Sequence, residues 1–166
     1  MKLVDRLLQI FFPGLIIGTL LVQMAPPLLD SAEQYYSRKR LDADVSVFYA
    51  AVQTAYAMAM QTHQRLGVEV LPTEWVIYRD VGLAWQRDEQ DEVIARGTWS
   101  EGLKFGSPLP HHRFFITDGR CYIDQFTACL DSEQIISSFS FTSDDAKRIY
   151  TLDLADREAR LDYDDF

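Results

Sequence analysis

The longest apolar run of the chain extends from Leu7 to Leu29 and contains no charged side chain, and Asp30 ends it. As an α-helix this run would be about 35 Å long, which is enough to cross a bilayer with some tilt. A cleaved signal peptide is the alternative, but its candidate cut after Ala25 is followed directly by two prolines. The pattern therefore predicts a cytoplasmic stub at residues 1–6, a transmembrane helix at 7–29 and one soluble unit at 30–166.

The next segment has the pattern of a long amphipathic helix, because no Gly or Pro occurs from Ser31 to Leu66. Its apolar residues recur at alternating steps of four and three, so we expect one buried stripe. The stripe consists of Leu41, Val45, Phe48, Val52, Ala55 and Ala59. Gly67 predicts the end of this helix, which gives it the range 30–67. Pro26 and Pro27 lie between the two helical patterns and predict one continuous helix with a kink at the membrane exit.

From Val68 onward the apolar period changes to two, which predicts β-strands. The predicted strands are 75–78, 92–95, 113–116, 135–141, 148–154 and 158–163. A polar stretch at 142–147 predicts a hairpin loop. The fold class is therefore α+β: a transmembrane helix continues into an amphipathic helix, which packs on an antiparallel β-sheet formed by residues 68–166.

Charge and cysteine content restrict the partners and the compartment. The net charge is −9 and the pI is near 4.7, which argues against nucleic-acid binding. Lys and Arg occur on both sides of the apolar run, at Lys2 and Arg6 and again at 38–40, so they do not decide the orientation. Cys121 and Cys129 are closely spaced, as in proteins of oxidising compartments. We therefore expect the soluble domain on the periplasmic side of a bacterial inner membrane.

The candidate chemistry is sparse. A disulfide between Cys121 and Cys129 would contribute roughly 2.5 kcal/mol, and free core cysteines are the alternative. The pair His111–His112 follows prolines and reads as an exposed loop, although Asp118 or Glu101 could pair with it. The acidic C-terminus reads as a solvated end rather than a calcium site. We expect the large aromatic residues to lie mainly in the core, namely Trp75, Trp85, Trp99, Phe114 and Phe115. We expect no catalytic residue, no cofactor and no metal.

The apolar run contains small residues that suit helix–helix packing in a membrane. Gly14 and Gly18 form a small-x-x-x-small step and Thr19 adds a hydroxyl beside it. The alternative is that both glycines only relieve strain next to Pro13.

The order of several short motifs is informative. A small-x-Pro motif at the end of the apolar run is followed by an Arg–Leu step and by an Ala-rich stripe that ends in Gly. A strand that begins with Trp, a Phe-rich strand with a turn glycine, and a closing hairpin come next. These motifs occupy 25–27, 40–41, 52–59, 65–68, 75–78, 114–119 and 155–161. In this order they resemble the type IV pilin superfamily, most closely the H-type minor pseudopilins of type II secretion. The family's processing motif is not matched, because Gly14–Leu15 is a candidate cut site but Thr19 stands where the family has a glutamate.

The resemblance implies a non-catalytic, membrane-anchored structural subunit whose partners are other membrane-protein subunits and the lipid bilayer. The alternative is a single-span accessory subunit of a respiratory, photosynthetic or transport complex that reuses the fold without processing. A third class, an anchored periplasmic enzyme or ligand-binding protein, has no catalytic pattern to support it.

Overall fold

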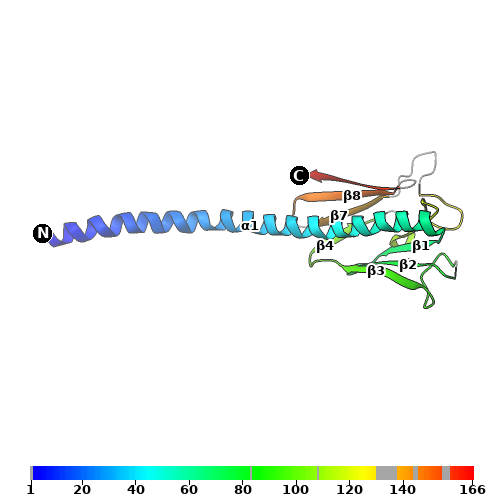
Figure 1. The fold of residues 1–166 in the computed structure, drawn as a ribbon. Helices are drawn as coiled ribbons and strands as arrows, with labels where there is room; N and C mark the ends of the chain where they lie inside the picture. Colours follow the sequence, from blue (N-terminus) through cyan, green and yellow to red (C-terminus); the bar gives the residue numbers. More distant parts are fainter. Residues whose placement is uncertain (1, 83, 108, 130–137, 144–145, 155–157) are drawn as a thin grey trace.

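A computed structural model describes residues 2–82, 84–107, 109–129, 138–143, 146–154 and 158–166, and for residues 2–30 and Pro110 it describes the backbone alone. One helix, α1 (Lys2–Thr62), dominates the shape (Figure 1). Its backbone passes through Pro26 and Pro27 as helix. The two helical patterns of the sequence are thus one continuous element, while the kink stays a prediction.

The helix ends five residues before the predicted stop at Gly67. His63 adopts a left-handed conformation (φ 55°), and its N–H donates to the carbonyl of Ala59 at 3.0 Å. A left-handed residue of this kind terminates an α-helix by turning the chain away from the axis. Gly67 lies instead in the first strand, so the predicted boundary at 67 is wrong.

Within the described residues, the strands form two antiparallel sheets rather than the single predicted sheet. The five-stranded sheet has the order β3-β2-β1-β5-β6, and the four-stranded sheet has the order β4-β7-β8-β9. The strands of the first are β1 (Leu66–Val70), β2 (Glu74–Arg79), β3 (Glu92–Thr98), β5 (Arg113–Thr117) and β6 (Arg120–Tyr122). Those of the second are β4 (Leu103–Gly106), β7 (Ser138–Ser143), β8 (Arg148–Leu154) and β9 (Ala159–Asp165). The sequence pattern did not predict β1, β4 or β6, and residues 135–137 of one predicted strand lie outside the described residues.

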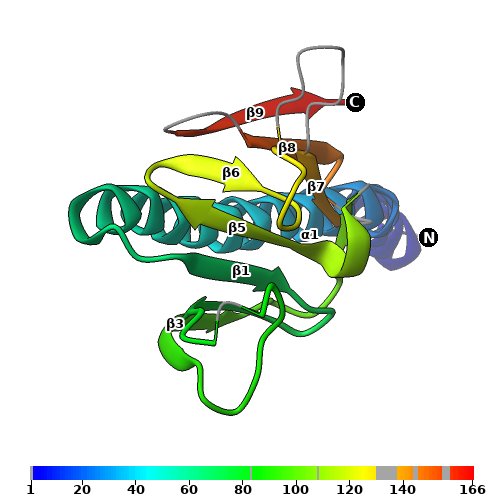
Figure 2. The same cartoon turned by 90° about the vertical axis from the view of Figure 1, so that its right-hand side faces the viewer.

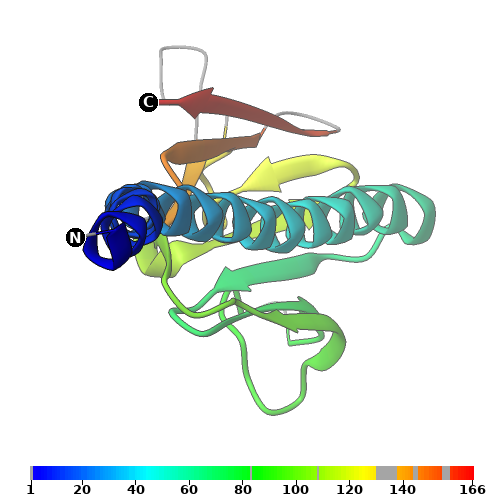
Figure 3. The ribbon, with the colours of Figure 1, turned by 90° about the vertical axis from the view of Figure 1, so that its left-hand side faces the viewer.

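Both sheets pack on the same side of α1. The strands lie in front of the helix in Figure 2 and behind it in Figure 3, which leaves the other side of the helix open. All six residues of the predicted stripe are at most 2% exposed, so that prediction is confirmed. Phe48 is the centre of the core, because its ring contacts Trp75, Trp99 and Phe141 at centroid distances of 5.5, 5.5 and 5.6 Å. It thereby joins the helix to strands of both sheets.

A second, smaller core covers the outer face of the five-stranded sheet. Trp85, on the β2–β3 connection, packs edge-on to Phe115 at 5.1 Å. The guanidinium of Arg65 lies 4.0 Å from the Trp85 ring, and its Nε donates to Asp80 Oδ2 at 2.6 Å. The Asp80 side chain is fully buried in this ion pair. Asp80 and Trp85 therefore pack this part of the β2–β3 connection onto the sheet as a lid.

The last strand is tied to the helix through Arg148. Its Nε donates to Asp165 Oδ1 at 2.6 Å, and its Nη1 lies 3.3 Å from Asp42 Oδ1 on α1. The Tyr150 hydroxyl donates to the same Asp42 oxygen at 2.8 Å. The hydrogen bond from Arg148 lowers the pKa of Asp165. Part of the acidic C-terminus is thus engaged in ion pairs.

Candidate interaction surfaces

The histidines do not form the acid–base pair considered from the sequence. His111 and His112 are exposed, as expected, on the short 3-10 turn Pro110–His112. Asp118 contacts a different histidine, because its Oδ1 lies 2.7 Å from His63 Nδ1. The His112 ring packs edge-on to Phe105 at 5.1 Å. Among the described residues, no group of three or more His, Cys, Asp or Glu side chains is placed to hold a metal ion.

Cys121 and Cys129 form a disulfide, with their Cα atoms 5.2 Å apart. Both cysteines are 1% exposed and belong to the main core. The disulfide closes the segment 123–128, which we call the Phe126 loop. At its base the Cys129 N–H donates to the Cys121 carbonyl at 2.9 Å. The predicted pairing is therefore present, and it anchors a surface loop in the core.

Internal hydrogen bonds hold the Phe126 loop in one shape. The N–H groups of Phe126 and Thr127 both donate to Asp124 Oδ1, at 2.8 and 2.9 Å. The Ile123 N–H donates to the Thr127 carbonyl at 2.8 Å. The hydrogen bonds to Asp124, above all the one from the Phe126 N–H, lower the pKa of its carboxyl group. The loop is thus ordered before any partner binds.

Phe126 stands out of this loop into solvent. It is 88% exposed, more than any other large apolar side chain of the described residues. A single exposed apolar residue is common on protein surfaces, but aromatic anchors on rigid supports are also what protein interfaces use. Sequence reasoning did not single out Phe126. The available signal was an aromatic residue two positions after an Asp within a short Cys-closed segment.

An apolar groove of about 210 Å³ separates α1 from the edge strand β3, and we call it the α1–β3 groove. Its walls are Ala51, Thr54, Ala55, Met58, Ile77, Ile94 and Ala95. The pairing of β2 with β3 shifts register at Ile77 and Tyr78 and skips Ile94. A β-bulge of this kind turns successive side chains to one face, which explains why Ile94 and Ala95 both line the groove. The small alanines of α1 leave the space open on the other side.

The helix face beside this groove carries no charge. From Val45 to Gln64 the sequence contains no Asp, Glu, Lys or Arg, although a quarter of the whole chain is charged. Part of this stretch is exposed, including Val47 at 60% and Met60 at 42%. The open side of α1 is therefore uncharged and partly apolar.

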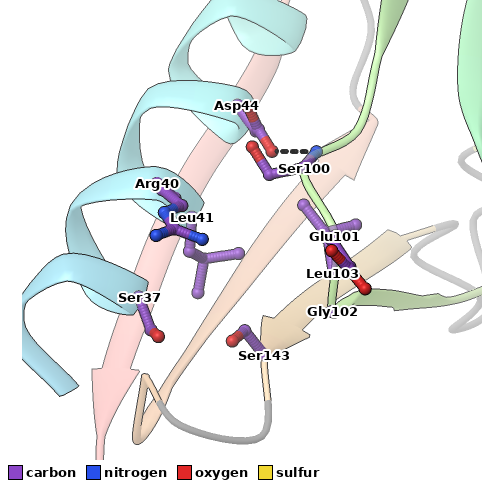
Figure 4. A pocket seen from close by; sticks show the side chains of 9 residues that line it. All are labelled: Ser37, Arg40, Leu41, Asp44, Ser100, Glu101, Gly102, Leu103 and Ser143. Carbon is purple, nitrogen blue, oxygen red and sulfur yellow. Dashed lines mark hydrogen bonds between the residues drawn. The ribbon is translucent and has the colours of Figure 1, made fainter. Parts of the chain in front are cut away.

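A polar pocket of about 270 Å³ lies where α1 meets the start of β4 (Figure 4). Its walls are Ser37, Arg40, Leu41, Asp44, Ser100, Glu101, Gly102, Leu103 and Ser143. Asp44 Oδ2 accepts a hydrogen bond from the Ser100 N–H at 2.7 Å, which caps the turn before β4. None of the nine lining residues is a histidine or a cysteine, and Asp44 is occupied in holding the turn. The pocket thus has the features of a structural junction.

The side chains expected to pack in the membrane, Gly14, Gly18 and Thr19, lie outside the part of the chain whose side chains are described. The same holds for Pro26 and Pro27, which were expected to kink the helix at the membrane exit. Among the residues whose side chains are described, no helix is long and apolar enough to span a membrane. The predicted span at 7–29 lies outside that set, so it stays a prediction.

No protein-family model and no curated protein matches this chain. Among solved structures, it is similar to the minor pseudopilin EpsH from the type 2 secretion system of Vibrio cholerae. The TM-score is 0.52, and the match covers 74% of this chain and 95% of that chain at 15% sequence identity. A similarity at this identity concerns the fold. The chain thus has a pilin-like fold, in which a long N-terminal helix packs on antiparallel sheets.

Proposed function

We propose that the protein is a non-catalytic, membrane-anchored structural subunit of the pilin type, closest to the H-type minor pseudopilins. The observation that carries this proposal is the course of α1. The helix extends from Lys2 through the apolar run and enters the core at Leu41. With the proposed span at 7–29 in the bilayer, this one element would connect the membrane to the folded domain, so lateral packing of the anchors would position the domains as well.

The disulfide supports a periplasmic position for the domain. Cys121 and Cys129 are bonded and buried in the core, and bonds of this kind persist in oxidising compartments. The soluble unit would then face the periplasm with the stub at 1–6 in the cytoplasm. Protease treatment of spheroplasts should degrade the domain. If the domain is degraded only after the membrane has been disrupted, it lies on the cytoplasmic side instead.

The partners are other membrane-protein subunits, and the assembly is expected to be hetero-oligomeric. Within the bilayer, Gly14 and Gly18 would let a neighbouring helix approach closely, with Thr19 available for a hydrogen bond. Replacing both glycines by Leu makes the run more apolar, so insertion should be retained. On a native gel of gently solubilised membranes, this variant should run free of the native complex. If the variant stays fully in the complex, the span acts only as a membrane anchor and not as a packing interface.

The second candidate function is a single-span accessory subunit of a larger membrane complex. Thr19 favours it, because the pilin family has a glutamate at this place that aids processing and filament insertion. A mass spectrum of the protein isolated from its native membrane separates the two candidates. Cleavage after Gly14 supports the pilin type, whereas an uncut leader, together with co-purification of a respiratory, photosynthetic or transport complex, supports the accessory subunit.

A further inference from the structure

The Phe126 loop and the α1–β3 groove lie at opposite edges of the five-stranded sheet. The groove borders β3, which is one edge strand, and the loop follows directly after β6, which is the other. Figure 2 shows β3 and β6 on opposite sides of β1 and β5. The loop of one molecule therefore cannot fill its own groove. A contact between this loop and this groove therefore has to join two molecules.

The groove has the size and the chemistry to take a phenyl ring. An engineered apolar cavity of about 150 Å³ binds benzene, and this groove measures about 210 Å³. Six of its seven lining residues are apolar, and the seventh, Thr54, bonds its hydroxyl to the Ala50 carbonyl of its own helix at 2.8 Å. A ring in the groove would leave that hydrogen bond intact. Filling the groove therefore removes apolar surface from water without stranding a polar group.

Charge also favours this pairing of surfaces. Each molecule carries a net charge of −9, so two copies repel each other over most of their surfaces. From Val45 to Thr62, α1 has no Asp, Glu, Lys or Arg, and neither does the loop from Gln125 to Ala128. On the β3 side of the groove, Glu92 is paired with Arg79 at 2.6 Å, and Arg96 is a cation. The one carboxylate of the loop, Asp124, is held by two backbone N–H groups. These surfaces can meet with little charge repulsion and little desolvation.

We propose that Phe126 of one copy inserts into the α1–β3 groove of a second copy. Because the two surfaces differ, the contact is head-to-tail, and it joins neighbouring copies of this chain within an assembly that also holds other subunits. One loop in one groove buries less than the roughly 1,200 Å² that a stable interface needs. The contact therefore acts together with anchors that already hold the copies in one membrane, where the effective concentration is high. In that respect the inference rests on the proposed function.

Photo-cross-linking of the full chain in its native membrane tests the contact. Phe126 is replaced by p-benzoylphenylalanine, and a second variant carries the same residue at Phe166, which is 72% exposed at the end of the chain. Illumination of the first variant should give an adduct of twice the monomer mass. Its cross-linked peptide should map to Ala51–Met58 or to Ile94–Ala95. The Phe166 variant should give no adduct at these positions.

Blocking the groove provides a second measurement. Thr54→Trp fills the groove from its exposed rim, whereas Thr62→Trp changes a threonine that lies outside it. The two threonines are matched, since each is exposed and donates to the carbonyl four residues earlier at 2.8 Å. Thr54→Trp should reduce the Phe126 adduct at least about tenfold, and Thr62→Trp should leave it unchanged. An unchanged adduct in the Thr54→Trp variant would overturn the proposal.

The outcomes separate this inference from the proposed function. An adduct between Phe126 and a different protein overturns the copy-to-copy contact and leaves the structural-subunit role intact. The same holds if no adduct forms although the protein migrates in a large complex. If no adduct forms and the protein migrates as a monomer, both are overturned. The cross-linked position decides the matter even if the groove variant fails to fold.

Discussion

Phe48→Ala should be among the most destabilising single changes in this protein, because Phe48 is the place where α1 meets both sheets. Its side chain is 0% exposed, and its ring lies 5.5 to 5.6 Å from three aromatic partners. Removing a buried Phe typically costs about 3–5 kcal/mol. Each aromatic pair contributes about 0.5–1.5 kcal/mol beyond its buried area. The expected loss is therefore about 4–5 kcal/mol, a large share of the stability of a typical domain.

The measurement is urea unfolding of a soluble fragment that begins at Ser31, followed by tryptophan fluorescence. Trp75 and Trp99 contact Phe48 and serve as the probes. If Phe48→Ala does not fold, Phe48→Leu keeps most of the apolar volume and should cost about 1.5 kcal/mol. The control is Val47→Ala, the neighbouring residue on the open side of α1, which is 60% exposed. Its effect should stay within about 0.5 kcal/mol.

A Phe48→Ala loss no larger than that of Val47→Ala would refute the reasoning. It would mean that the helix is not packed against both sheets at this point. The two sheets would then have to be stable without their shared contact to α1.

Three further changes test other parts of the fold. Asp80→Ala leaves the buried Arg65 guanidinium without its carboxylate and should cost about 3–5 kcal/mol in urea unfolding; the Arg65→Met/Asp80→Leu double variant should recover much of this loss. Gly67→Ala places a Cβ against the buried ring of its cross-strand partner Tyr78 and should lower the stability by about 1–3 kcal/mol. Burial, followed by the charge of a nearby carboxylate, raises the pKa of Asp153, so its ionised form disfavours folding. Asp153→Asn should therefore raise the melting temperature at pH 7, and the gain should shrink as the pH falls through the pKa of Asp153; a gain that is constant down to pH 3 would contradict this assignment.

The amphipathic helix was predictable in position and orientation from the sequence alone. The stripe from Leu41 to Ala59 has the helical period, and burial of a face follows from that period whatever covers it. The end of the helix was not predictable in this way. Arg65, Leu66 and Gly67 look like a C-terminal stop, but the left-handed turn at His63 ends the helix earlier so that β1 can pair with β2 and β5.

Whether a strand could be predicted from the sequence depends on whether one or both of its faces are covered. In the four-stranded sheet, β8 alternates between covered and open positions, and its limits of Arg148 and Leu154 were predicted correctly. In the five-stranded sheet, β1 is buried along almost its whole length, because α1 covers one face and the lid with Trp85 covers the other. Alternation disappears from a strand that is buried on both faces.

The candidate surfaces also differ in how far the sequence indicated them. The closely spaced cysteines indicated a closed loop, and the order of motifs indicated the pilin-like fold. The α1–β3 groove needs the alanines of the helix and the bulge at Ile94 to face each other, and these are far apart in the sequence. Local periodicity therefore determined which face of each element is apolar. Tertiary packing alone decided which of those faces are covered and which remain open to a partner, because that depends on elements brought together from distant parts of the chain.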